Sequence, residues 1–221
     1  MQDIELEQAV EVLLAHTQPV SETEHVPLLD AMGRVAAEDV CAGFDNPPFD
    51  RSPLDGYTFA AASTHGASAE NPATLRLIGE ECAGDFFAGQ VGAGECVRIM
   101  TGGAIPKGCD CVVRQEDVRE DGDRIHVPFT SEPYENYCYA GEDIKKGTVL
   151  IRRGQRIHAA HLAVLASEGY GDVLVYRRVR VAVASTGDEL LQPGEPLRPG
   201  KIYNSNLYLL AGRLKELGAE V

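Results

Sequence analysis

The sequence predicts an α/β plus β fold, in which a β-rich domain is inserted into a small α/β domain and a partial α/β unit follows at the C-terminus. Three observations predict it. Strand-length apolar segments separated by glycines fill residues 57–137, helix and strand patterns flank them on both sides, and a last strand–turn–helix pattern begins at Val179. We expect the small α/β domain at 1–48 and 138–177, the inserted domain at 49–137, and the partial unit at 178–221.

The composition indicates an acidic globular protein. The 221 residues include 34 acidic and 20 basic side chains, which give a formal net charge of -14, and 44% of the residues are hydrophobic. Nucleic acids and anionic membranes need a positive protein surface, so the charge argues against both as partners. An acidic protein that binds an anion needs local N–H groups, a few cations or a divalent metal. Of these, a metal fits the charge best.

The sequence also indicates a reduced, cytoplasmic protein. The N-terminus is acidic where a secretory signal would be basic, and no apolar segment approaches the roughly 20 residues of a membrane span. The six cysteines are scattered without a C-x-x-C pair. In a chain without a signal we therefore expect reduced thiols.

The N-terminal flank is predicted from helical periodicity followed by a proline-rich crossing. Apolar residues at helical spacing predict a helix over 3–16, which ends before Pro19 and could pack on the third domain. Residues 26–40 mix helix and strand patterns that the sequence does not resolve. Three prolines make residues 43–56 a rigid extended crossing at a domain boundary.

Short alternating segments predict the inserted domain. Partial period-two alternation predicts strands at 75–78, 95–99, 110–113 and 124–127, and a turn at Gly122-Asp123 precedes the last of them. Several short strands at this spacing are typical of a small β-barrel or sandwich.

The second flank follows a boundary near residues 141–143. We predict a hairpin of 149–151 with 156–157 around Arg153-Gly154, a helix over 159–167 that ends at Gly169, and a strand over 172–176. The partial unit is predicted as a buried strand at 179–184, a polar turn at 185–189, a helix over 205–217 closed by Gly218, and the start of a second strand at 219–221.

A strand–turn–helix–strand unit of this kind cannot bury its apolar face alone. Parallel strands are usually covered on both sides of the sheet. We therefore expect either a longer protein or a remnant of the last domain.

Two turn segments of the inserted domain could carry chemistry. Turn chemistry alone favours a β-turn closed by Asp55-Gly56, although the flanking prolines could also hold the Asp55 carboxylate rigidly for a metal or a water. Thr101-Gly102-Gly103 follows a predicted strand and favours a tight hairpin turn. Alternatively, its hydroxyl and free backbone N–H groups would suit a phosphate or carboxyl contact.

The partial unit offers a further candidate. The turn Ser185-Thr186-Gly187-Asp188-Glu189 lies at the carboxyl end of a parallel-type strand, where open α/β sheets bind ligands, and Gly187 permits close approach. Thr186 and Glu189 also match a capping box that would start a helical turn. Asn204 or Ser205 is a candidate N-cap, and the helix N-terminus could join the 185–189 turn in one floor that accepts an oxyanion.

Two other groups carry less weight. Cys109 and Cys111 lack a second pair or a histidine at zinc spacing, so we expect thiols that fill the core. His158 and His161 show no acidic or cysteine partner, which favours surface or helix-end roles.

Taken in order, these motifs resemble those of the molybdopterin molybdenumtransferases, the family that includes the gephyrin E domain. The resemblance covers essentially the whole chain. It is carried by PFDRSPLDGY at 48–57, IMTG at 99–102, PKGCDCVV at 106–113 with Glu116, GED at 141–143, STGDEL at 185–190 and IYNSN at 202–206. The family usually has Ala-Met at Pro53-Leu54, and alanine at Cys109, Cys111 and Gly103.

The resemblance implies an elongated homodimer. Its subunit would hold a small α/β domain, a β domain, a three-layer α/β domain of the molybdopterin-binding type, here only partial, and a C-terminal β-barrel. The implied reaction is the Mg²⁺-dependent insertion of molybdate into adenylylated molybdopterin, with release of AMP. We expect the complete protein to be an enzyme and these 221 residues alone to be inactive.

The resemblance also implies residue roles. Asp55 and Thr101 would line the site from the β domain and face the third domain of the partner subunit, and Asp143 and Glu189 would be further acidic site residues. Asp55 and Glu189 would bind the metal or orient a water. The substrate would contact Ser185, Thr186, Gly187 and Asp188, with Asn204 and Ser205 behind them.

Two other interpretations stay open. One is a non-catalytic dimerising scaffold built on the same fold, and the other is a simple β-barrel module that dimerises without binding a pterin. Asp55, Thr101 and Glu189 favour the enzyme, because scaffolding requires no polar pocket.

Overall fold

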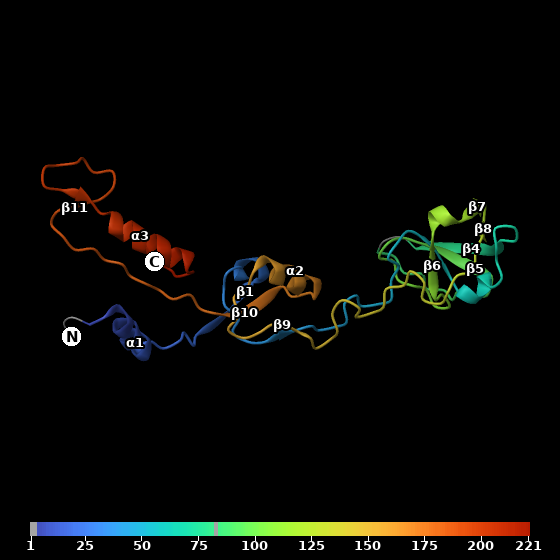
Figure 1. Cartoon of the computed structure of the whole chain (residues 1–221), viewed down its shortest axis with the longest axis horizontal. Helices are drawn as coiled ribbons and strands as arrows, with labels where there is room; N and C mark the ends of the chain where they lie inside the picture. The colour runs from blue at the N-terminus through green and yellow to red at the C-terminus, as the bar shows by residue number, and fades with distance from the viewer. Residues whose placement is uncertain (1–3, 82–83) are drawn as a thin grey trace. The chain divides into compact units, whose positions relative to one another are not determined.

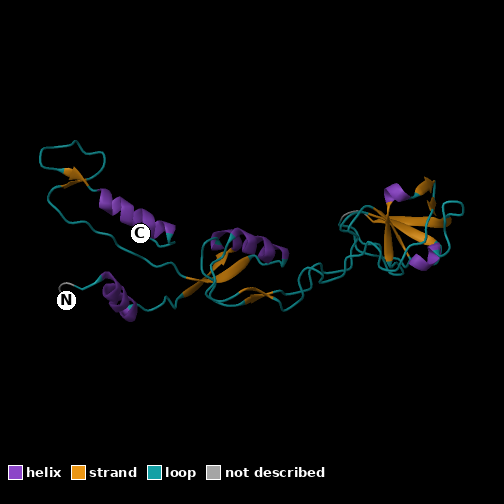
Figure 2. Cartoon of the chain, viewed as in Figure 1, coloured by secondary structure: helices purple, strands orange, loops and turns teal. Residues whose placement is uncertain are grey.

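The chain divides into two compact units, Cys41–Thr148 and Met1–Val40 with Val149–Val221. We call the first the inserted unit and the second the flanking unit. The computed structural model describes residues 4–81 and 84–221, whose helices and strands are shown in Figures 1 and 2. The domain boundaries predicted near residues 48, 137 and 177 stay a prediction.

The inserted unit is built on one mixed six-stranded sheet. The strand order is β6 (Cys111–Arg114), β3 (Gly56–Phe59), β5 (Glu95–Ile99), β4 (Ala73–Glu81), β8 (Arg124–Val127) and β7 (Arg119–Asp121). Strands β4 and β5 run parallel, and the other neighbouring pairs run antiparallel. The short 3-10 helices η2 (Ala61–Thr64) and η3 (Gln115–Asp117) follow β3 and β6.

Most strands of this sheet were predictable. The four predicted strands are confirmed as β4, β5, β6 and β8, and the turn at Gly122-Asp123 joins β7 to β8. The sequence did not predict β7, because its residues are all charged and exposed and show no apolar alternation.

The prediction of a β-turn at Asp55-Gly56 is wrong, because Gly56 begins the strand β3. Gly56 pairs with Ile99 of β5 on one side and with Arg114 of β6 on the other. A Cβ on Gly56 would lie 1.8 Å from the Val113 carbonyl oxygen. Glycine is therefore needed for a close backbone approach within the sheet, not for a turn conformation.

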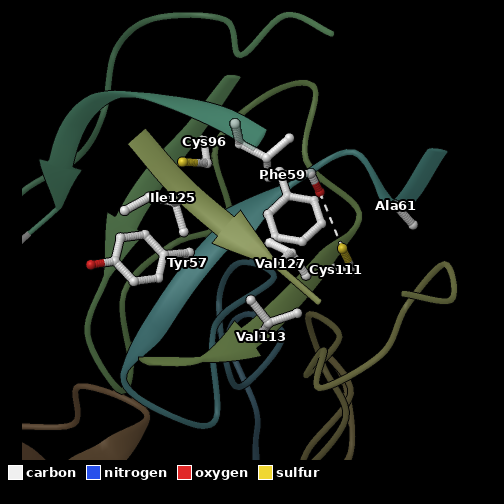
Figure 3. Packing of buried hydrophobic residues seen from close by; sticks show 9 residues of the cluster. Tyr57, Phe59, Ala61, Cys96, Cys111, Val113, Ile125 and Val127 are labelled. Carbon is white, nitrogen blue, oxygen red and sulfur yellow. Dashed lines mark hydrogen bonds between the residues drawn. The ribbon is translucent and has the colours of Figure 1, made fainter. Parts of the chain in front are cut away.

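The core of the inserted unit packs around β3. Tyr57 and Phe59 are fully buried and lie with Cys96, Cys111 and Ile125 in one apolar cluster (Figure 3). The Cys111 thiol donates to the Phe59 carbonyl oxygen over 3.4 Å, and burial raises the pKa of this thiol to about 12. Fully burying one such apolar side chain contributes about 1.5–3 kcal/mol.

The prediction that Cys109 and Cys111 fill the core is confirmed for the buried Cys111, whereas Cys109 is only partly buried. Cys96, for which no such prediction was made, is buried as well. Cys41 and Cys138 are also only partly buried, and Cys82 lies outside the described residues.

The flanking unit centres on a two-stranded antiparallel sheet of β1 (Thr23–Pro27) and β10 (Asp172–Tyr176). The helix α2 (Ala159–Ser167) and the 3-10 helix η1 (Leu28–Ala31) contribute Leu165 and Ala31 to one apolar cluster with Val173 and Val175 of β10. The predicted helix 159–167 and strand 172–176 are confirmed. Gly169, with φ of +80°, follows the end of α2 as predicted.

The N-terminal helix is confirmed as α1 (Leu6–His16), and residue 3 of the predicted helix lies outside the described residues. None of the α1 residues is buried. The predicted hairpin of 149–151 with 156–157 is wrong. Strand β9 (Val149–Ile151) pairs with β2 (Val40–Cys41), and Arg156 bridges to Val35.

The C-terminal segment holds the helix α3 (Ser205–Glu216), which confirms the predicted helix, and a two-stranded parallel ladder of β11 (Leu190–Leu191) with β12 (Ile202–Tyr203). The predicted buried strand at 179–184 is wrong. Within the described residues its only ladder contact is one bridge between Arg180 and Glu220, so the predicted second strand at 219–221 is likewise a single bridge. A strand needs paired neighbours along its length, and in the described residues this segment has only that one bridge.

The longest helix in the described part of the chain, α3, has 12 residues, and none of the helices there could span a bilayer.

Replacement of Gly56 tests the importance of the close approach between β3 and β6. We expect Gly56→Ala to lower the free energy of unfolding by about 3 kcal/mol or more, because the new Cβ would overlap the Val113 carbonyl. Urea unfolding followed by circular dichroism measures this change. Gly43→Ala is the matched control, since a Cβ there meets no atom within 4 Å, and it should change the free energy by less than about 1 kcal/mol. Equal stability of Gly56→Ala and the wild type would contradict the interpretation.

Candidate functional site

Asp55 and Thr101 form a direct contact in the inserted unit. The Asp55 Oδ1 atom accepts hydrogen bonds from the Thr101 backbone N–H over 2.7 Å and from the Thr101 hydroxyl over 2.8 Å. Both residues are exposed. The second carboxylate oxygen, Oδ2, accepts no hydrogen bond from the described residues, so it is available to a ligand.

The sheet places these two residues together. Gly56 pairs with Ile99, so the residues before β3 and after β5 leave the sheet at the same edge. After Ile99 the chain turns sharply: the Gly103 N–H donates to the Met100 carbonyl over 2.8 Å, and Gly102 has φ of +85°. This is the glycine position of a type II turn, and it holds Thr101 at the corner.

The chain turns tightly at Thr101–Gly103 as predicted, but the prediction of a hairpin is wrong, because β5 pairs with β3 and β4 and not with β6, the next strand in the chain. The turn also does not offer free N–H groups. The Thr101 N–H donates to Asp55, the Gly102 N–H to the Ser52 carbonyl over 2.8 Å, and the Gly103 N–H to Met100. The hydroxyl of Thr101 also donates to Asp55. This turn therefore orients a carboxylate and cannot itself receive an anion through its backbone.

The same contacts fix the charge of Asp55. The Thr101 backbone N–H, the Thr101 hydroxyl and the positive charge of Arg98 hold the pKa of Asp55 below its ordinary value of 3.8. Because the folded pKa is lowered, the contribution of this contact to stability is present above pH 3.8. It is lost as the pH falls through the folded pKa. At neutral pH the carboxylate is ionised.

Arg51 ties Asp143 to the segment that carries Asp55. The backbone groups of Arg51 and Cys138 exchange two hydrogen bonds of 2.9 and 3.1 Å. The Arg51 guanidinium lies 3.4 Å from the Asp143 carboxylate, which is exposed. The next residue, Ser52, bonds through its backbone to Gly102 and Gly103. The three predicted site residues of the inserted unit thus come from adjacent segments.

Asp50 links its own segment to residues 137–140 by hydrogen bonds, a role that was not predicted from the sequence. Its carboxylate accepts hydrogen bonds from the Tyr137 hydroxyl over 2.6 Å and from the Ala140 N–H over 2.8 Å. This role of Asp50 could have been indicated by the sequence, because Asp50 and Asp55 lie on either side of Pro53 in a proline-rich, rigid segment.

The 185–189 turn lies in the flanking unit and is exposed. The predicted alternative of a capping box is wrong, since no helix begins there and Leu190 enters β11. A Cβ on Gly187 would lie 2.6 and 2.7 Å from the two carboxylate oxygens of Glu189. The Glu189 carboxylate therefore lies close to the Gly187 backbone, and the Gly187 φ of +151° is one that residues with a Cβ rarely adopt.

Lys201 supports this turn and was missed from the sequence. Its Nζ donates to the Asp188 carbonyl over 2.6 Å, and the Ile202 N–H donates to the Glu189 carbonyl over 2.9 Å. A single lysine before the apolar pair Ile202-Tyr203 gives no sequence signal for such a contact. Lys201 places one positive charge beside the acidic residues Asp188 and Glu189.

Asn204 is the N-cap of α3, as predicted. Its side chain accepts from the Leu207 N–H over 3.3 Å, it is buried, and its own N–H donates to the Leu191 carbonyl over 2.9 Å. Ser205 is the first residue of the helix. We predicted that this helix end and the 185–189 turn together form an oxyanion-binding site, and this stays a prediction.

The donor set fits a magnesium ion only in part. Within the part of the chain that the structure describes, no three His, Cys, Asp or Glu side chains are grouped for a metal. Magnesium, however, is usually held by one or two carboxylates together with substrate phosphates and water. The ionised Asp55 carboxylate, with one oxygen available, suits such a site.

Among the discounted residues, His158 and His161 lie at the start of α2, where the His158 N–H donates to the His161 Nδ1 over 3.0 Å. This confirms a helix-end role.

Comparison with known proteins gives a consistent result. The family model of the MoeA N-terminal region (domain I and II) matches residues 4–169. The molybdopterin molybdenumtransferase of Haemophilus influenzae is 37% identical over 218 residues, which cover 98% of this chain and 52% of that protein. The protein of the same name from Bacillus subtilis is 40% identical over 210 residues, which cover 93% of this chain and 49% of that protein.

A crystal structure of the molybdopterin biosynthesis moeA protein from Pyrococcus horikosii superimposes with a TM-score of 0.86 at 37% identity. The match covers 99% of this chain and 56% of that chain. The chain thus spans about half the length of the relatives that it matches.

The electrostatic role of Thr101 can be measured directly. We expect Thr101→Val to raise the pKa of Asp55 toward 3.8, because the hydroxyl donor is lost. The pKa should stay below 3.8, because the backbone N–H is the larger of the two effects. Nuclear magnetic resonance titration of the carboxyl carbon reports both values. Glu95, whose pKa is lowered by the Gly92 N–H and Arg76, is the internal control and should not change. An unchanged Asp55 pKa in the variant would contradict the assignment.

Proposed function

Because this chain belongs to the MoeA family, we propose that it acts in molybdenum cofactor biosynthesis as a molybdopterin molybdenumtransferase. The full-length protein would insert molybdate into adenylylated molybdopterin in a Mg²⁺-dependent reaction that releases AMP. We assign it to the cytoplasm. The expectation that these 221 residues alone are inactive stays a prediction.

The Asp55–Thr101 contact is the observation that carries this proposal. Two donors from Thr101 use one oxygen of Asp55 and leave the other for a ligand. The substrate, molybdate and AMP are all anions, and an acidic chain needs a cation to bring them to a carboxylate. Magnesium, held by Asp55 and by Glu189, would stabilise negative charge on the phosphate oxygens when it is bound.

The chain's own residues would then position the substrate. Thr101 lowers the pKa of Asp55 and fixes the direction of its carboxylate. Arg51 holds Asp143 to the same segment, where it is a second acidic group for orienting a water. Gly187 permits close approach to the 185–189 turn, and Lys201 offsets part of the negative charge there. Ser185 and Thr186 would contact the pterin or its phosphate, with Asp188 beside them.

We further propose a homodimer in which Asp55 and Thr101 of one subunit act with the 185–189 turn of the other. The two groups belong to different compact units of the chain, and the resemblance expects the site to combine them across two subunits. The alternative of a non-catalytic scaffold would leave an ionised carboxylate and its two donors without a role.

Neutral replacements of the carboxylates test the enzymatic assignment. We expect Asp55→Asn and Glu189→Gln in the full-length protein each to reduce AMP release by about 100-fold or more, because charge at the reacting phosphate is lost. The assay uses adenylylated molybdopterin, Mg²⁺ and molybdate. Glu70→Gln, an exposed residue in the inserted unit, should leave the rate unchanged. If both site variants keep normal rates while the protein still self-associates, the scaffold interpretation holds.

Mixing the two variants tests whether the site is shared between subunits. When subunits of Asp55→Asn and Glu189→Gln exchange at random, half of the dimers contain one of each, and such a dimer has one intact site of its two. We expect recovery of about one quarter of the wild-type rate, following from the two-fold symmetry of a homodimer. The measurement is AMP release after subunit exchange. No recovery, with exchange confirmed by mass spectrometry, would place both residues in one subunit's site.

A further inference from the structure

Three tyrosines of the inserted unit form a partly exposed cluster that the proposed mechanism does not use. The chain has eight tyrosines, six phenylalanines and no tryptophan, and Tyr134, Tyr137 and Tyr139 lie within six residues of each other. We call these three residues the tyrosine cluster. Such a concentration in an aromatic-poor chain calls for a physical reason.

The three rings are in mutual contact. The Tyr134 ring centroid lies 5.4 Å from that of Tyr137, in an edge-to-face arrangement, and 5.6 Å from that of Tyr139. The Tyr137 and Tyr139 centroids are 5.1 Å apart. These spacings are those of favourable aromatic pairs, and they are too short for another ring to enter between two of them. A ligand ring would have to stack on an outer face.

The outer members of the cluster are open to solvent. Tyr134 is 56% exposed and Tyr139 is 48% exposed, whereas Tyr57 and Phe59 in the core of the same unit are fully buried. Tyr137 anchors the group: its hydroxyl donates to Asp50 over 2.6 Å, and burial, the Asp50 hydrogen bond and the Asp50 charge raise the pKa of Tyr137, so that it stays a donor.

The backbone holds the cluster in a conformation that costs energy. Tyr134 has φ of +65°, in the left-handed region that a tyrosine rarely adopts, and Asn136 has φ of +49°, which asparagine adopts more readily. The Tyr134 N–H donates to the Asp110 carbonyl over 2.6 Å, and the Asn136 side chain donates to the Val112 carbonyl over 2.9 Å. Strained backbone fixed in this way by its surroundings is concentrated at ligand-binding segments.

The cluster lies next to the segment that carries the proposed site. Asp50, which binds Tyr137, precedes Asp55 by five residues, so the chain limits their Cα separation to about 18 Å. Adenylylated molybdopterin carries two planar heterocycles, a pterin and an adenine, joined through phosphates. Under the proposed function, a substrate with its phosphate near Asp55 would bring its rings to the same part of the inserted unit as the cluster.

We propose that Tyr134 and Tyr139 form a stacking platform for a planar heterocycle, the pterin or the adenine of the substrate. This inference rests on the proposed function for the identity of the ring. Electron-rich tyrosine faces bind flat heterocycles by stacking, and base–aromatic stacking tolerates different bases because each presents a π-face. The platform would add affinity and orientation without taking part in the reaction.

The test measures ring binding and catalysis separately in the full-length protein. Isothermal titration calorimetry with AMP, and separately with 6-methylpterin, distinguishes the two possible rings. We expect Tyr134→Ala with Tyr139→Ala to weaken binding of one of these probes by about 5- to 100-fold. In the AMP-release assay the same variant should raise KM for adenylylated molybdopterin by a similar factor and leave kcat unchanged.

Two control variants keep the test sharp. Tyr134→Phe with Tyr139→Phe retains both rings and should bind within about twofold of the wild type. Phe86→Ala removes a 66% exposed aromatic ring elsewhere on the same unit and should change nothing. Normal probe binding by the double alanine variant would overturn the proposal. A lower particle mass in light scattering with unchanged probe affinity would also overturn it, because the cluster would then be a subunit contact.

Failure of this inference and failure of the proposed function can be told apart. If the wild-type protein binds a probe through the cluster but releases no AMP, the proposed function is contradicted and the stacking site is still supported. A wild type that releases AMP, while the double alanine variant keeps its KM and its probe affinities, would retain the function and remove the platform.

Discussion

The hydrogen bonds from Thr101 to Asp55 are the interaction on which the rest of the site depends. They exist because Gly56 lets β3 lie against β6 while pairing with Ile99 of β5, which brings the start of one strand beside the end of the other. A bulkier residue at Gly56 would disturb this register, and Thr101 would lose its position. The sheet of the inserted unit is therefore the scaffold that sets the direction and charge of one exposed carboxylate.

In the proposed function, this contact would explain how a protein with a net charge of -14 binds anionic substrates. The backbone N–H groups of residues 101–103 already donate hydrogen bonds within the protein, so this turn has no free N–H group to bind an anion. What it supplies is an ionised oxygen ligand, which attracts a divalent cation. In the proposed function that cation, together with the charge of Lys201 near Glu189, makes the binding of phosphate and molybdate electrostatically favourable.

Local patterns predicted elements that need only local contacts. The helices α2 and α3 and the strands β5, β8 and β10 follow the periodicity of their own side chains. Elements defined by distant partners were not predictable: Gly56 was interpreted as a turn glycine because its need arises from the Val113 carbonyl, 57 positions away in the chain. Residues 179–184 have strand composition, but in the described residues they form only one bridge, between Arg180 and Glu220. The site residues were predicted by family resemblance, whereas Asp50 and Lys201 act through contacts that no short motif records.

The most direct test of the central claim is a crystal structure of the full-length protein with Mg²⁺ and AMP. We expect the ion within about 2.1 Å of the Asp55 carboxylate oxygen that Thr101 does not bind, and Glu189 of the partner subunit beside the same ion or the AMP phosphate. An ion and a nucleotide bound away from Asp55 in every subunit, with the Asp55–Thr101 contact intact, would contradict the account.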